Sequence, residues 1–264
     1  DSAASGTALS SGLKTYNGAI GVDRDTVAVK TMLEWAEEKE MATGLVATST
    51  VTHATPASFA AHVDYRRKEA EIARQYAEKE IDVILGGGKQ FWPDNLIADY
   101  EKSGGQFIDE IDDPLEENKR ILGLFAEDAL PTVHEGRSPT TTEMARLAIE
   151  RVEKNPNGFF VMIEESQVDW GGHSNNAEYI QGEMASLNEV INYALDYQET
   201  HPDVLVVLTA DHECGGVAVH DGTDAGLDIR FTSGYHSANF VPIWATGPGA
   251  EVFDAFMDNT EIGK

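Results

Sequence analysis

The residues Val204-Leu205-Val206-Val207-Leu208-Thr209-Ala210-Asp211-His212-Glu213 join an apolar run directly to three possible metal ligands. A short, unbroken apolar run is typical of a strand that is buried on both faces of a parallel sheet. Open α/β sheets hold their active sites at the carboxyl ends of such strands. This stretch therefore predicts an α/β fold with a chemical site at the end of a strand.

Strand and helix patterns alternate along the rest of the chain. Short apolar runs predict further strands at 44–48, 81–85, 121–125, 158–164 and 241–245. Apolar spacing or composition predicts helices at 2–13, 26–39, 57–79, 138–155 and 177–199, with a polar, irregular segment at 103–118. The alternation predicts a single α/β domain over residues 1–264, with a mainly parallel central sheet flanked by helices on both faces.

The composition is strongly acidic, with 46 Asp and Glu residues against 19 Lys and Arg residues and a formal net charge of −27. Such a field repels nucleic acid and anionic membrane surfaces, so neither is an expected partner. The acidity is typical of proteins that work at high salt, and we expect activity and stability to depend on salt. The sequence contains neither an apolar run of the roughly 18 residues that a membrane span needs nor a signal-peptide pattern.

Two further segments carry possible metal ligands. Asp169 and His173 are four residues apart, which places both side chains on one face of a helical turn. Together with His236 they supply one carboxylate and two imidazoles, a ligand set that leaves a fourth position open, as in catalytic zinc sites. The single cysteine, Cys214, excludes an internal disulfide and is either a small buried residue or a stray ligand.

Four other residues complete the predicted metal chemistry. Asp211 and His212 are adjacent, so both can face one pocket only if the strand has ended before them. Glu164 and Thr55 offer the hard oxygen ligands that suit magnesium. Each pattern alone is weak, but their combination predicts a hydrolase with bound divalent metals. The other histidines, of which His62 is one, are expected to be ordinary surface or core residues.

Several segments resemble the alkaline phosphatases in the order in which that family carries them. They are residues 1–8, 14–18, 20–23, 52–56, 164–173, 209–213 and 247–250, together with Arg66. The similarity runs over nearly the whole chain. It implies a three-layer α/β sandwich that hydrolyses small phosphomonoesters.

The resemblance implies a role for each matched residue. Ser2 would be the nucleophile and would form a phosphoserine that water hydrolyses. Arg66 would bind two phosphate oxygens, and Asp1 would orient its guanidinium group. The implied metals are two zinc ions and one magnesium ion. Their ligands would be Asp169, His173 and His236 for the first zinc, Asp211 and His212 for the second, and Glu164, Thr55 and His53 for the magnesium.

The sequence departs from the family pattern at four places. One is Trp170, which stands where some members carry Lys or His. His53 stands where some members carry Asp, which would change how tightly the magnesium is held. The stretch between His212 and His236 is too short for an insertion that some members use at their dimer interface, so a homodimer stays an open expectation. The family's leading strand, with an Asp that bridges two metals, has no counterpart. We therefore expect a chain that is truncated at its N-terminus.

Two alternative functions remain open. One is a superfamily relative, such as a phosphodiesterase, a sulfatase or a cofactor-independent phosphoglycerate mutase. Ser2 lacks the Cys/Ser-x-Pro-x-Arg context of sulfatases, and diesterases usually lack a counterpart of Arg66. The other is a non-catalytic module that binds phosphate and metal. The habit of the family implies a periplasmic or secreted protein.

Overall fold

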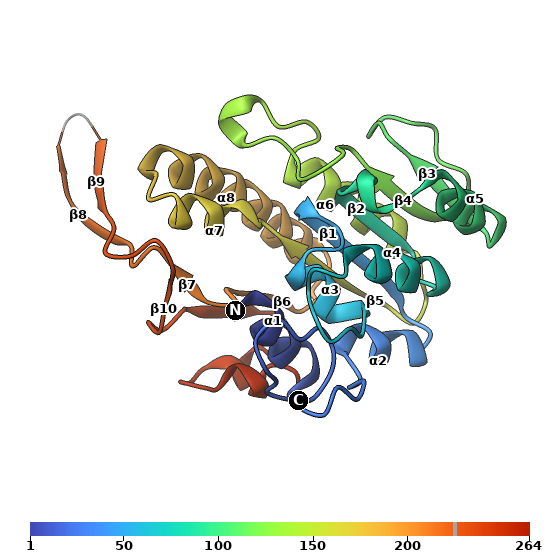
Figure 1. Cartoon of the computed structure of the whole chain (residues 1–264), viewed down its shortest axis with the longest axis horizontal. Helices are drawn as coiled ribbons and strands as arrows, with labels where there is room; N and C mark the ends of the chain where they lie inside the picture. Colours follow the sequence, from blue (N-terminus) through green and yellow to red (C-terminus); the bar gives the residue numbers. More distant parts are fainter. Residues whose placement is uncertain (224–225) are drawn as a thin grey trace. The chain divides into compact units, whose positions relative to one another are not determined.

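The computed structural model describes residues 1–223 and 226–264. The chain separates into two compact units. The first comprises Asp1–Leu130, Arg137–Glu164 and Asp258–Lys264, and the second comprises Pro131–Gly136 and Glu165–Met257. That the two units form one domain over residues 1–264 stays a prediction. Figure 1 labels the helices α1–α8 and the strands β1–β10 of the two units.

The first unit is built on a parallel sheet. Among the described residues it has five strands in the order β3-β4-β2-β1-β5, and every neighbouring pair is parallel. The strands are β1 (Ala42–Thr50), β2 (Val83–Gly87), β3 (Gly105–Ile108), β4 (Arg120–Leu124) and β5 (Phe159–Glu164). The predicted α/β class is confirmed. The prediction of an irregular segment over 103–118 is wrong at β3, because that short edge strand carries too few apolar residues to stand out.

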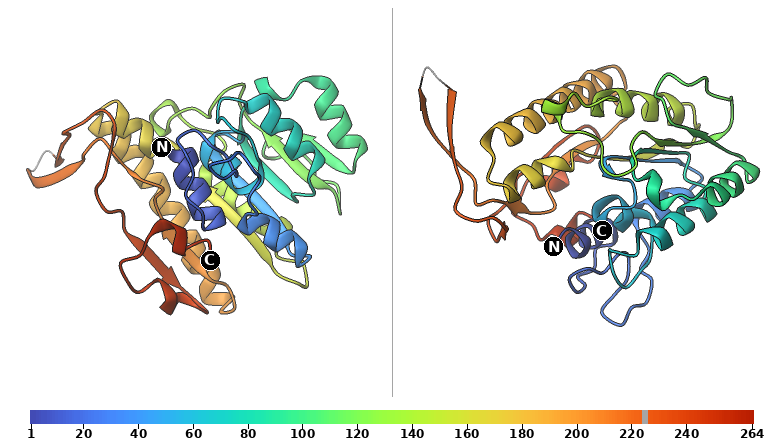
Figure 2. Two further views of the ribbon diagram at one scale, coloured as in Figure 1. Left: turned by 60° about the horizontal axis from the view of Figure 1, so that its bottom comes forward. Right: turned by 45° about the horizontal axis from the view of Figure 1, so that its top comes forward.

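Helices cover both faces of this sheet. Leu45 of β1 packs into one apolar cluster with residues of the helices α1 (Ser2–Ser11), α2 (Met32–Glu38), α3 (Ala54–Ala60), α4 (Glu69–Glu78) and α5 (Asp94–Lys102). The next residue, Val46, packs into a second cluster with Met144 and Ala148 of α6 (Thr141–Val152). Neighbouring strand residues point to opposite faces, so the sheet lies between two helical layers, as Figure 2 shows. The predicted three-layer architecture is confirmed.

Two predicted helices have different bounds in the structure. The helix expected at 26–39 begins only at Met32, where Thr31 and Glu34 form a capping box. The helix expected at 57–79 is two helices, α3 and α4. The loop between them is held from outside, because Gln75 exchanges two hydrogen bonds with the backbone of His62. This interruption creates the loop that carries Arg66.

The last residues of the first unit return to its first helix. The 3-10 helix η4 (Asn259–Glu261) packs on α1. Asn259 donates a hydrogen bond to Ser5, and Lys14 pairs with Asp258 at 2.6 Å. A Cβ atom at Gly263 would lie 2.5 Å from the backbone nitrogen of Gly12, so only glycine allows this approach.

The second unit contains one long helix and three two-stranded sheets among its described residues. Its helices are η2 (Val133–Glu135), α7 (Gln167–His173), α8 (Ala177–Thr200) and η3 (Ala250–Phe253). Its strands are β6 (Val206–Thr209), β7 (Glu213–Cys214), β8 (Ala218–Thr223), β9 (Gly226–Arg230), β10 (His236–Ser237) and β11 (Ile243–Thr246). In the part of the chain that the structure describes, they form antiparallel pairs: β6 with β11, β7 with β10, and β8 with β9.

The strand β6 differs from the one predicted from the apolar run at 204–208 in its pairing and in its exposure. β6 pairs with β11 in antiparallel fashion, and Leu205 and Val207 are 41% and 37% exposed. The expectation of a parallel strand buried on both faces is therefore wrong for β6, because an apolar run does not encode the direction of its partner. None of the described helices is long and apolar enough to cross a membrane.

Candidate active site

Asp1 organises the predicted anion-binding end of the first unit. Its Oδ1 atom accepts hydrogen bonds from the backbone N–H groups of Ala3 and Ala4 at 3.1 and 3.2 Å, which caps helix α1. The same atom accepts from Gly18 N at 3.0 Å. Its Oδ2 atom lies 3.1 Å from Arg66 Nη1. Ser2 is buried in the first turn of α1, directly after this carboxylate.

The loop between α3 and α4 positions Arg66. Its backbone N–H donates to Gly18 O at 2.7 Å. Its guanidinium group donates to Asp1 and lies 3.1 Å from His53 Nε2 through Nη2. Asp1, His53 and Arg66 also line one hollow of about 510 Å³. The structure thus brings together a buried hydroxyl-bearing helix start and a guanidinium group fixed by a carboxylate, which suits a bound anion.

The predicted magnesium ligands lie at two element ends of the first unit. Glu164 is the last residue of β5, and Thr55 lies in the first turn of α3, after His53. The Oγ1 atom of Thr55 is buried and has no hydrogen-bond partner within residues 1–223 and 226–264. Because a buried hydroxyl oxygen is costly to leave unpaired, this orphaned atom fits a role as a cation ligand.

The second unit gathers the predicted ligands of the first zinc. The ligand atoms of Asp169, His173, Cys214 and His236 all lie within 4.8 Å of one another. The two Nε2 atoms of His173 and His236 are 3.0 Å apart, and the Oδ1 atom of Asp169 lies 3.2 Å from His236 Nε2. His173 Nδ1 lies 2.8 Å from the carbonyl of Gly234. A donation to that carbonyl leaves a lone pair on Nε2, and lone pairs crowded together in this way fit a divalent cation.

Asp211 and His212 lie just beyond β6, so the strand has ended before them as the sequence required. The His212 ring stacks on the His236 ring with 3.5 Å between their centroids. His212 Nε2 lies 3.1 Å from Asp211 Oδ2, and its Nδ1 lies 4.0 Å from Asp169 Oδ1. Both predicted zinc sets therefore meet in one place within the second unit.

Local electrostatics favour a neutral, coordinating imidazole at His236. Burial, and then the neighbouring charge of His212, lower the pKa of His236 below its ordinary value. Burial, and then the contact with Asp169, raise the pKa of the Cys214 thiol well above its ordinary range. A histidine that is neutral near pH 7 keeps a lone pair for a metal, and a protonated thiol is a weak ligand.

Glu213 has a role that the sequence did not reveal. Its carboxylate accepts hydrogen bonds from the backbone N–H groups of Gly216 and Val217 at 3.2 and 3.0 Å, and from the hydroxyl of Ser237. Glu213 therefore braces the turn after β7 and ties it to β10, which carries His236. Its place directly after Asp211 and His212 was the only signal in the sequence.

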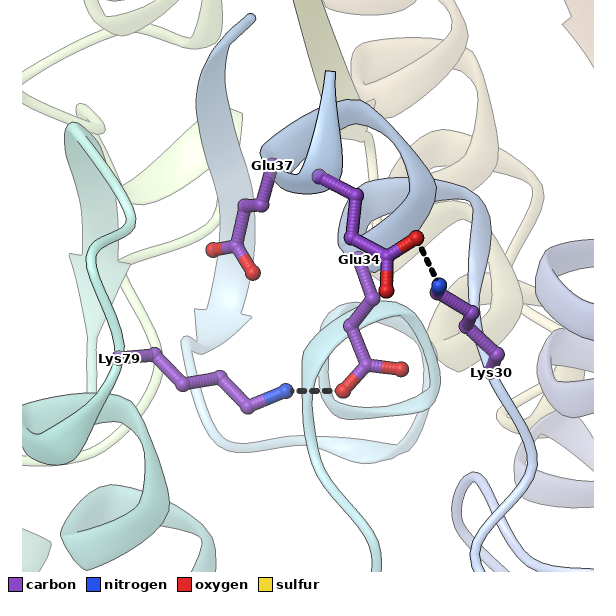
Figure 3. A pocket seen from close by; sticks show the side chains of 5 residues that line it. Lys30, Glu34, Glu37 and Lys79 are labelled. Carbon is purple, nitrogen blue, oxygen red and sulfur yellow. Dashed lines mark hydrogen bonds and ion pairs between the residues drawn. The ribbon is translucent and has the colours of Figure 1, made fainter. Parts of the chain in front are cut away.

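A second hollow, of about 560 Å³, contains none of the predicted site residues. Figure 3 shows Lys30, Glu34, Glu37 and Lys79 on its wall. Glu34 Oε1 lies 2.5 Å from Lys79 Nζ and 2.8 Å from the ring nitrogen Nε2 of His62. Burial alone would raise the pKa of Glu34, but the hydrogen bonds from His62 and Lys79 lower it to about 2. These charges join α2 to the ends of α3 and α4, which is a structural role.

The fold and the grouped ligands together define a metal-dependent hydrolase of the α/β class. Comparison with known proteins narrows this class. The family model for alkaline phosphatase matches residues 1–229. The chain belongs to the alkaline phosphatase family, whose members are phosphoric monoester hydrolases, so the predicted family and enzyme class are confirmed.

Individual relatives agree with this assignment. Alkaline phosphatase 3 of Bacillus subtilis (strain 168) is 34% identical over all of this chain and 75% of its own length. The chain covers only half of alkaline phosphatase 4 of the same organism, at 38% identity. The solved alkaline phosphatase of the Antarctic bacterium TAB5 superposes with a TM-score of 0.92 at 37% identity, over 100% of this chain and 81% of that one. TAB5 variants with one histidine replaced by Glu or Asp contain magnesium in a site called M3.

Proposed function

We propose that this protein hydrolyses small phosphomonoesters through a phosphoserine formed on Ser2. The observation that carries this proposal is the Asp1 carboxylate, which holds both the start of α1 and the Arg66 guanidinium group. A phosphate bound by Arg66 would lie near the first turn of α1, where Ser2 stands.

The bond changes follow from this placement. The Oγ atom of Ser2 forms a bond to phosphorus while the ester P–O bond breaks and the leaving oxygen takes up a proton. A water molecule then displaces Ser2, which regains its proton, and inorganic phosphate is released. Arg66 binds two non-bridging oxygens throughout both steps. Asp1 holds the Arg66 guanidinium group in the orientation that this binding needs.

The metal assignment is part of the proposal. Two zinc ions and one magnesium ion would be held by the following residues: Asp169, His173 and His236; Asp211 and His212; and Glu164, Thr55 and His53. When bound, such cations make a serine hydroxyl more acidic and stabilise a leaving oxygen. The orphaned Thr55 hydroxyl and the crowded Asp169 and His236 atoms support these assignments.

The test uses p-nitrophenyl phosphate at alkaline pH, after chelator stripping and re-addition of zinc and magnesium. We expect metal-restored turnover that is lost in Ser2→Ala and kept in Ser11→Ala, a serine at the far end of the same helix. Acid quenching with labelled phosphate should trap label on the parent chain but not on Ser2→Ala. Turnover that survives Ser2→Ala would refute the serine nucleophile. A preference for diesters or sulfate esters would refute the substrate class.

We also propose a setting for the enzyme. The net charge of −27 supports work at high salt, and the family resemblance supports a periplasmic or secreted location and a homodimer. Turnover and melting temperature that stay flat from low to molar salt would contradict the first point. Sedimentation of the metal-loaded protein tests the dimer, and fractionation of the source cells tests the location.

A further inference from the structure

The hollow beside Arg66 has a wall that the proposed phosphate site does not use. Besides Asp1, His53 and Arg66, it is lined by Gly18 and by four side chains with no role so far: Asn17, Tyr65, Arg67 and Glu69. All of these residues belong to the first unit. A phosphate held by Arg66 would therefore have an ester group with room to enter this hollow.

Two of these side chains are held by the protein itself. The Tyr65 ring lies against the backbone of Gly18, where a Cβ atom would come within 2.8 Å of it, yet 46% of the residue is exposed. Glu69 Oε2 accepts hydrogen bonds from the hydroxyls of Thr50 and Thr52 at 2.6 and 2.8 Å. Tyr65 is thus a fixed apolar wall, and Glu69 is turned toward threonine partners.

Arg67 differs from both. Its side chain is exposed and makes neither a hydrogen bond nor an ion pair with any residue in the described ranges 1–223 and 226–264. Its neighbour Arg66 is paired with Asp1 at 3.1 Å. In a chain with 46 acidic residues, a guanidinium group without a carboxylate partner at the rim of a hollow is a ready site for a ligand's negative charge.

We propose that Arg67 determines substrate specificity by favouring phosphomonoesters whose leaving group carries a second anionic group. This inference rests on the proposed function, because it takes Arg66 to hold the scissile phosphate. Arg67 then supplies the only uncommitted cation among the residues described as lining this hollow. The Tyr65 ring flanks the leaving group, so an aromatic or short carbon chain that bears a carboxylate or a second phosphate fits best.

The experiment compares phenyl phosphate with 4-carboxyphenyl phosphate, which differ by one carboxylate. In the metal-loaded full chain, Arg67→Gln should lower kcat/KM for the carboxylated ester about fivefold, as expected for an exposed ion pair. It should change kcat/KM for phenyl phosphate less than about twofold. Arg67→Lys should keep part of the preference. The control is Arg74→Gln, which removes the same charge from an exposed position of α4 outside the hollow.

The outcomes separate this inference from the function on which it rests. Equal losses for both esters in Arg67→Gln would overturn the inference, and so would an equal change of preference in Arg74→Gln, since that would be a long-range field effect. Absence of turnover of both esters by the parent chain would instead refute the proposed function. Circular dichroism and the melting temperature of each variant show whether it is folded. If Arg67→Gln does not fold, the preference for the carboxylated ester is measured with Arg67→Lys instead.

Discussion

The two units hold their functional side chains in different ways. In the first unit, β1 has nine residues that are all buried, and helices pack on both of its faces. In the second, Cys214 and His236 lie on the paired strands β7 and β10, which have two residues each and are half-buried. The anion-binding residues of the first unit therefore lie beside a buried core, whereas Cys214 and His236 of the second unit lie on a short, half-buried strand pair. We infer that bound metal contributes more to the order of the second unit than of the first.

The largest expected effect tests this dependence on metal. His236→Ala should lower kcat/KM for p-nitrophenyl phosphate at least about a hundredfold and reduce bound zinc, because even a residue that only supports a ligand is typically worth 10- to 100-fold. His220→Ala, at an exposed histidine of β8, is the matched control and should leave both nearly unchanged. Hydrogen exchange after chelation should rise at β10 and stay low at β1. An equal rise at β1 would show that bound metal orders both units to the same extent.

The second effect concerns apolar burial. Leu45 in β1 is 1% exposed, and Leu45→Ala should cost about 3 kcal/mol of unfolding free energy through the cavity that it leaves. Val207 in β6 is 37% exposed, and Val207→Ala should cost less than about 1 kcal/mol. Urea unfolding followed by circular dichroism measures both values. Similar costs would show that the second unit is packed as firmly as the first.

A third, smaller effect is the acid sensitivity of the first unit. Because the folded-state pKa of Glu34 is lowered to about 2, its carboxylate stabilises the fold above the ordinary glutamate pKa. This stability is lost as the pH falls from about 5 toward about 2. Glu34→Gln should therefore cost about 1–2 kcal/mol at pH 7 and less at pH 3. Urea unfolding of the parent chain and of Glu34→Gln at pH 3 and pH 7 measures these costs.

The smallest effect has the opposite sign. Burial raises the pKa of Glu37, although Lys79 opposes the shift, so the folded state binds the proton more tightly than the unfolded state. The stability that this carboxyl contributes is full at low pH and is lost as the pH rises through its folded pKa. Glu37→Gln should then raise the unfolding free energy at pH 8 by less than about 1 kcal/mol. Thermal melts of Glu37→Gln and Glu34→Gln at pH 4 and pH 8 should shift in opposite senses.

The amount that the sequence could predict also differs between the units. The strands β1, β2, β4 and β5 were predictable because each is a compact apolar run between turn residues. The break between α3 and α4 was not, because alanine and charged residues continue through it. It is set by contacts made across the fold, such as those of Gln75 with His62. In the second unit, the run at β6 gave the strand but not its antiparallel partner.

In the candidate site, too, local sequence patterns were predictable and long-range contacts were not. Ligand types and spacing pointed to Asp169, His173 and His236, and the family resemblance added Ser2, Arg66 and Asp1. The interactions that connect these residues could not be predicted, because they join distant parts of the chain. The bond from Gly18 to Asp1 and the contact of His62 with Glu34 each span more than ten residues. No local pattern in the sequence encodes such pairs.

The return of residues 258–264 to α1 has a consequence for biosynthesis. The ribosome makes α1, which ends at Ser11, before the segment that covers one side of it, which begins at Asp258, so 246 residues are made in between. At about 5–20 residues per second, that delay is about 12–50 s. During this time the nascent chain presents an incompletely covered first helix. A chaperone that recognises exposed apolar or small-residue surfaces would therefore have time to bind it before residues 258–264 are made.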